Sequence, residues 1–178
     1  MTTRRLKYLA RLPRIIAAVA LVSIAAGCGD DSSSPTPAPT PVIPNVQGQW
    51  TGEYQIASCN NTGVFATSPP FCNTFNVGSV WPVRLTLTQT GTQLSGTLEL
   101  GAATMQVSGP IGSSGQLLLT GTGSIVQGGV TFNVSLANWN TTVAGTSMSG
   151  GWGINWTTTF GTGNAATSNT IRTVTKTG

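Results

Sequence analysis

The chain has 178 residues, and its eight Lys and Arg against four Asp and Glu give a formal net charge of +4, with no histidine. Most of the positive charge lies between Arg4 and Arg14, so the chain after Cys28 is close to neutral. Nucleic-acid binding needs Lys and Arg clustered against phosphates, and no such cluster remains after Cys28. The composition therefore excludes a nucleic-acid partner, and the length fits one domain behind a targeting segment.

Residues 1–27 have the pattern of an export signal. A basic stretch that ends at Arg14 leads into an apolar run of about a dozen residues, which suits a signal-peptide core and is short for a membrane span. The run ends in Ile24-Ala25-Ala26-Gly27-Cys28. These residues resemble the lipobox of bacterial lipoproteins. The resemblance implies cleavage before Cys28 and acylation of that cysteine, for example with palmitate.

Residues 28–45 carry almost nothing that a core could bury. Their Asp, Ser, Thr, Pro and Ala predict a solvated tether between the lipidated cysteine and a folded domain. Several acyl chains, which the lipoprotein resemblance implies, make a stable membrane anchor. Gly29 stands where inner-membrane lipoproteins carry Asp. The resemblance therefore implies an outer-membrane location in a Gram-negative envelope, on the periplasmic or the surface face.

The two remaining cysteines form an even pair. An exported domain folds in an oxidising compartment, so Cys59 and Cys72 are predicted to form a disulfide. The loop that this bond would close stabilises the fold by about 3 kcal/mol in the chain-entropy model. Without histidine, and without the short spacing of zinc or redox motifs, this pair does not predict a metal site.

Residues 46–178 are predicted to be all-β, because apolar residues alternate with polar ones in short runs separated by Gly and Asn. Eight such runs are expected, at residues 46–56, 83–87, 94–100, 105–107, 117–119, 130–136, 148–156 and 171–176. Short sequential connections favour an eight-stranded antiparallel up-and-down β-barrel, filled by side chains or holding one small ligand. A β-sandwich of the carbohydrate-binding kind is the alternative fold.

Gly48-Gln49-Trp50, with Tyr54 on the same run and Arg172 on the last run, resembles the calycin signature that lipocalins and avidins share. The resemblance implies that Trp50 closes the base of the barrel and that Arg172 packs across its indole ring, a contact with a cation–π component. Avidins also place a carboxylate near the last strand, whereas this chain has no Asp after Asp31.

The remaining candidate residues are aromatic. Exposed rings at a barrel mouth favour a ligand, and packed rings would only fill the interior. The candidate ligand-binding residues are Tyr54, Trp81, Trp139, Trp152 and Trp156. The first hypothesis is thus a membrane-anchored, lipocalin-like barrel that binds a small apolar molecule. The alternative is a structural or adhesive envelope protein with a filled barrel or a glycan-binding sandwich.

Catalysis is not expected. General acid and base chemistry needs titratable groups within reach of each other, and residues 46–178 contain no histidine and only two carboxylates, Glu53 and Glu99. Their Ser and Thr hydroxyls lack a base that would activate them. The sequence predicts no cofactor and no enzymatic activity.

Overall fold

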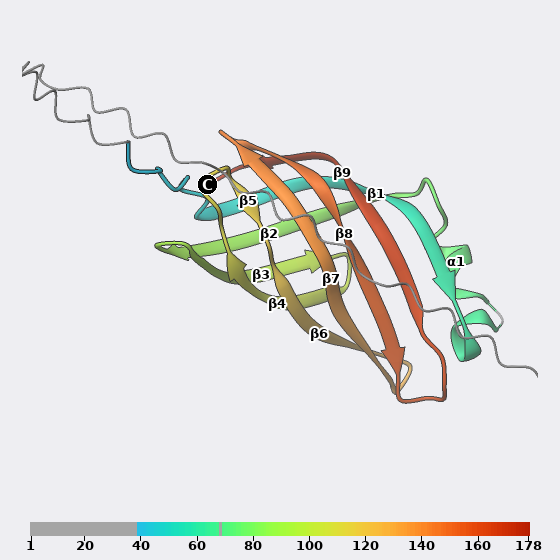
Figure 1. Cartoon of the computed structure of the whole chain (residues 1–178). Helices are drawn as coiled ribbons and strands as arrows, with labels where there is room; N and C mark the ends of the chain where they lie inside the picture. The colour runs from blue at the N-terminus through green and yellow to red at the C-terminus, as the bar shows by residue number, and fades with distance from the viewer. Residues whose placement is uncertain (1–38, 68) are drawn as a thin grey trace, which may run out of the picture. The chain divides into compact units, whose positions relative to one another are not determined.

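The computed structural model describes residues 39–67 and 69–178 of the chain. The predicted signal peptide, the predicted acylation site Cys28 and the first part of the predicted tether lie outside these residues. Within the described residues, nine strands and two short helices follow one another (Figure 1). They are β1 Gly48–Asn61, η1 Gly63–Ala66, α1 Phe71–Thr74, β2 Val80–Thr90, β3 Gln93–Leu100, β4 Ala103–Pro110, β5 Gln116–Leu117, β6 Thr120–Gln127, β7 Val130–Ala144, β8 Ser147–Thr158 and β9 Ala165–Lys176.

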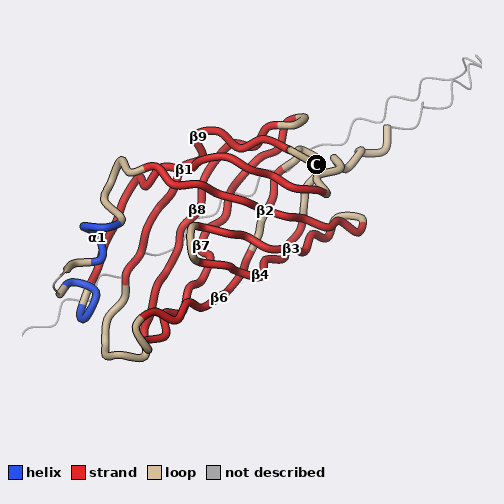
Figure 2. The backbone as a smooth tube through the Cα atoms, turned by 180° about the vertical axis from the view of Figure 1, so that it is seen from behind, coloured by secondary structure: helices blue, strands red, loops and turns tan. Residues whose placement is uncertain are grey.

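Eight of these strands form a closed antiparallel barrel. Neighbours in sequence pair with each other, β4 pairs with β6, and the first strand β1 pairs with the last strand β9 along almost its whole length (Figure 2). The additional pairing of β7 with β8 completes the ring. This closure confirms the predicted eight-stranded up-and-down barrel and rules out the β-sandwich. The ninth strand, β5, pairs with Thr141 and Thr142 of β7, and its Leu117 also forms an isolated bridge with Ile111.

The hydrophobic core lies inside the ring, because every second residue of a strand points inward. Trp50, Tyr54 and Ile56 of β1 are buried, as are Leu85 and Leu87 of β2. The opposite faces of these strands carry Thr, Ser, Asn and Gln, so the inside is apolar and the outside is polar but almost uncharged. All described strand pairings and core residues fall within Pro39–Gly178, which is one compact unit. This segment therefore contains everything that the barrel needs to fold.

The barrel has two distinct ends. We call one the α1 end, where the β1–β2, β3–β4, β6–β7 and β8–β9 connections lie, and the other the C-terminal end (Figure 1). At the α1 end the long β1–β2 connection folds back over the ring and is tied to β1 by the predicted disulfide between Cys59 and Cys72. Among the described residues, no helix has the length and apolarity to cross a membrane.

The predicted runs match the observed strands except at three places. The run expected at 130–136 is the first half of β7, which continues to Ala144. Residues 117–119 were expected to be a full strand, whereas only Gln116–Leu117 pairs, and the barrel strand is the next segment, β6. Two inward positions of β6 are Gly121 and Gly123, so the apolar alternation that reveals other strands is missing there. The last strand begins at Ala165 rather than Ile171. The sequence pattern did not reveal its first half, because the inward residues there are small or polar.

A close approach between β1 and β9 depends on Gly52. A Cβ atom at this position would overlap the backbone carbonyl oxygen of Thr173 on β9. We therefore expect Gly52→Ala to force the two closing strands apart and to lower the free energy of unfolding by about 1–3 kcal/mol. Urea denaturation followed by circular dichroism measures this loss. The control is Thr173→Ala, which removes an exposed side chain and should cost less than about 1 kcal/mol; equal losses for both variants would contradict the steric explanation.

Candidate functional site

Trp50 is buried near the C-terminal end of the barrel, but Arg172 does not pack across it. The Trp50 ring is fully buried, and its Nε1–H donates to the carbonyl oxygen of Val46 at 2.9 Å. The cation above the ring is Lys176, with its Nζ 6.0 Å from the ring centroid and its backbone directly opposite Trp50 in the β1–β9 ladder. Arg172 is exposed, because a bulge places Thr173 opposite Glu53 and Ile171 opposite Tyr54. Arg172 is thus the extra residue of the bulge and projects from the ladder.

The α1 end is filled by an aromatic cluster, which we call the mouth cluster. It joins side chains of the β1–β2 connection to rings on three barrel strands. Phe71 and Phe75 stack at 4.5 Å between ring centroids, and both contact Trp156 of β8, at 5.4 and 6.0 Å. The members are Phe65, Phe71, Phe75, Trp81, Phe132 and Trp156.

The mouth cluster is only partly covered. Phe65 and Trp156 are buried, whereas Phe71, Phe75 and Trp81 retain some exposure. The disulfide holds this arrangement, since Cys72 lies next to Phe71 and bonds to the end of β1. The cluster therefore presents partly accessible aromatic surface at one end of the barrel, on a segment that is connected to the ring by a covalent bond.

A second aromatic group, the inner cluster, lies deeper in the barrel. Trp139 of β7 stacks on Trp152 of β8 at 4.7 Å with the planes 18° apart, and Tyr54 of β1 contacts Trp152 at 5.2 Å. Trp152, Ile154 and Trp156 alternate along the inward face of β8, so Ile154 separates the two clusters. The five aromatic residues predicted from the sequence thus all lie inside the ring or at its mouth. Trp139 was expected near a strand end but lies within β7.

Polar atoms accompany the inner cluster. In the described part of the chain, the buried polar side chains are Thr141, Thr167 and Asn169, and none of them is ionisable. Trp139 Nε1–H donates to Thr141 Oγ1 at 2.7 Å, and Asn169 Nδ2 donates to the carbonyl oxygen of Trp152 at 3.2 Å and to Thr167 Oγ1 at 3.3 Å. Two buried atoms have no hydrogen-bond partner in the structure, Trp152 Nε1 and Asn169 Oδ1.

The sequence alone does not distinguish these three polar residues. Thr141, Thr167 and Asn169 lie among many other Thr and Asn residues of the chain, and only their strand phase distinguishes them. The register of β9 with β8 would have identified two of them, because Asn169 and Thr167 face Trp152 and Ile154 across the ladder. Phe71 and Phe75 were missed because the β1–β2 connection was expected to be an irregular loop without packing partners.

The charged side chains of the described residues are outside the buried core. Glu53 lies on β1 and is exposed, and Glu99 of β3 pairs with Arg84 of β2 at 3.8 Å across the outer face. This pair is more than two-fifths exposed on both sides, so it contributes at most about 1 kcal/mol. Among residues 39–67 and 69–178, no three His, Cys, Asp or Glu side chains come together as a metal site.

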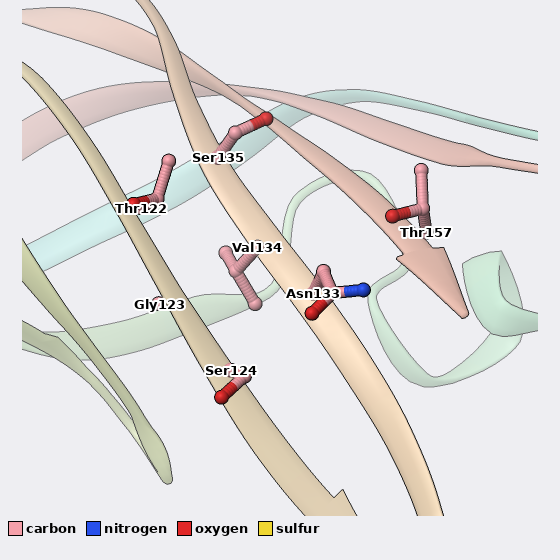
Figure 3. Close-up of a pocket in the computed structure, with 7 residues that line it drawn as sticks. All are labelled: Thr122, Gly123, Ser124, Asn133, Val134, Ser135 and Thr157. Carbon is pink, nitrogen blue, oxygen red and sulfur yellow. The ribbon is translucent and has the colours of Figure 1, made fainter. Parts of the chain in front are cut away.

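The outer wall also carries open depressions. One lies over β6, β7 and β8 and is lined by hydroxyl and amide side chains (Figure 3). Its lining residues are Thr122, Gly123, Ser124, Asn133, Val134, Ser135 and Thr157. A surface of this kind can hydrogen-bond to sugars or water but offers no aromatic ring for stacking.

Comparison with known proteins does not add a relative to this description. No protein-family model, no curated protein and no solved structure matches the chain.

The environment of Tyr54 can be tested by titration. Burial raises the pKa of its hydroxyl from 10.0 to about 12, because the interior disfavours the phenolate. Tyr54 is the only tyrosine in residues 39–178, so the ultraviolet absorbance of tyrosinate reports on it alone. We expect the folded barrel to titrate at about 12 and the urea-unfolded chain at about 10.

The same shift predicts how stability depends on pH. Below pH 10 the hydroxyl is protonated in both states, and between about 10 and 12 only the unfolded chain loses the proton. The free energy of unfolding should therefore fall as pH rises through this window. A folded-state titration near 10 would contradict the burial of the Tyr54 hydroxyl.

Proposed function

We propose that this protein is a bacterial envelope lipoprotein, anchored through acylated Cys28, whose barrel binds a small and largely apolar ligand at its α1 end. The disulfide between Cys59 and Cys72 supports a location outside the cytoplasm, since such bonds persist in oxidising compartments. The lipobox-like residues and Gly29 favour the outer membrane. The barrel fold is compatible with a lipocalin-like binding protein.

The observation that carries the ligand proposal is the mouth cluster. Phe71 and Phe75 pack on Trp156, Trp81 packs on Phe75, and all three rings remain partly accessible at the α1 end. Flat apolar surfaces of this kind bind small molecules through burial and ring stacking. A ligand that separates Phe71 and Phe75 from Trp156 would lie between the β1–β2 connection and the barrel wall. Its polarity would be low, because the connection contains no charged residue.

Binding can be measured with N-phenyl-1-naphthylamine, an uncharged apolar dye whose fluorescence rises in an apolar environment. We expect saturable binding to residues 39–178 and an affinity about tenfold lower in Trp156→Leu, because the ring that contacts Phe71 and Phe75 is lost. The matched control is Phe160→Ala. Phe160 lies in the β8–β9 connection at the same end but is 72% exposed.

The two variants distinguish the interior from the rim. Loss of dye binding in Phe160→Ala with retention in Trp156→Leu would place the dye on the outer rim, and absence of saturable binding to the unsubstituted barrel would overturn the ligand proposal. Circular dichroism of each variant confirms that the barrel is still folded.

The anchor is tested separately in a bacterial host. We expect the full chain to incorporate labelled palmitate and to fractionate with membranes, and Cys28→Ser to lose both properties, because the lipid is attached to that sulfur. Cys72→Ser is the matched control, since it also removes one thiol but lies in the barrel domain. Equal labelling of the Cys28→Ser chain would rule out the proposed anchor.

The alternative function, a structural or adhesive envelope protein, is favoured by a different observation. The outer wall presents neutral hydroxyl and amide groups over several strands, as in the depression of Figure 3. Such a wall suits contact with glycans, and it requires no ligand inside the barrel. An unsubstituted barrel that does not bind the dye would support this second function.

A further inference from the structure

We infer that the inner cluster contains a polar subsite for the head of the ligand, formed by Trp152 Nε1 and Asn169 Oδ1. This inference rests on the proposed ligand function and deepens it. The subsite would take a neutral group that both accepts and donates a hydrogen bond, such as a carboxamide or a hydroxyl, at the end of an apolar body.

The two atoms are complementary and belong to neighbouring residues. Trp152 and Asn169 are direct cross-strand partners on β8 and β9, and both side chains are 3% exposed on the inward face. Trp152 Nε1 is a donor without an acceptor, and Asn169 Oδ1 is an acceptor without a donor. The orientation of the Asn169 amide is fixed, because only its NH₂ group can donate to the Trp152 carbonyl oxygen.

Folding alone does not explain this pair. A buried polar atom without a partner costs about as much as a lost hydrogen bond, and nearly all buried polar groups in proteins are satisfied. The neighbouring groups follow that rule, since Trp139 Nε1 has Thr141 Oγ1 and Asn169 Nδ2 has two acceptors. The two unsatisfied atoms therefore stand out as a donor and an acceptor that a bound molecule would complete.

The surroundings determine the class of that molecule. No ionisable side chain other than the Tyr54 hydroxyl belongs to the buried set of the described residues, and Lys176 is engaged with Trp50 at the C-terminal end. An anionic head would therefore be buried without a counter-charge, which is strongly unfavourable. A neutral head satisfies both atoms, while the Trp139, Trp152 and Tyr54 rings contact the adjoining apolar carbons.

The position fits entry through the mouth cluster. Trp156 lies nearer the α1 end of β8 and Trp152 lies four residues deeper on the same inward face. A molecule whose apolar body rests against Trp156 and Phe75 would have to extend past Ile154, which lies between the two clusters, to place its head at Trp152 and Asn169.

The test uses naphthalene compounds that share one apolar body and differ in the head. In residues 39–178, 2-naphthamide and 2-naphthalenemethanol should displace the dye at about tenfold lower concentration than 2-acetylnaphthalene, which only accepts, or 2-naphthoate, which is an anion. In Asn169→Leu this preference should disappear while dye binding persists. The indole N–H resonance of Trp152, identified by its loss in Trp152→Phe, should shift when 2-naphthamide is added.

The outcomes separate the subsite from the proposed function. Dye binding without any preference among the four heads, or with no change in the Trp152 resonance, overturns the subsite and leaves the function standing. If neither the dye nor the naphthalene compounds bind, the proposed function and the subsite both fail.

Discussion

The antiparallel pairing of β1 with β9 is the interaction on which the rest of the barrel depends. It runs from Trp50 opposite Lys176 to Asn61 opposite Ala165, and it joins the two edges that an open sheet would leave free. A closed ring has one interior, so each strand must present side chains without charge at alternate positions. The few charged groups of the described barrel are consequently on the outer wall or at the ends, and the chemistry of the interior is limited to aromatic rings, hydroxyls and one amide.

Bulges determine which residues reach that interior. On β7 the inward residues are Val134 and Leu136 before Asn138, whose φ is 50°, and Trp139 and Thr141 after it. One extra residue in a strand changes the phase of all that follow, so the bulge brings Trp139 onto Trp152. The bulge on β9 acts in the same way. It turns Arg172 out of the ladder and brings Lys176 to Trp50.

These phase changes explain how far the sequence could predict the fold and the site. Regular alternation of large apolar residues identified β1, β2, β3 and β8 and, with the short connections, predicted the closed barrel. It failed for β6, whose inward residues include two glycines, and for the first half of β9, where Ala165, Thr167 and Asn169 face inward. The rings of Tyr54, Trp152 and Trp156 could be placed inside from their strand phase. The partner of Trp50 could not, because a bulge is a property of two paired strands and not of one run of residues.

The polarity of the inner cluster sets stability against binding. The Nδ2 group of Asn169 donates two hydrogen bonds and so contributes to folding, but its Oδ1 atom is buried without a donor. The indole N–H of Trp152, on the cross-strand partner residue, is likewise unpaired. Preorganised polar atoms of this kind cost free energy in the unliganded protein and contribute binding free energy when a complementary head is present. A ligand head of the kind we propose would therefore recover the free energy that the two unpaired atoms cost.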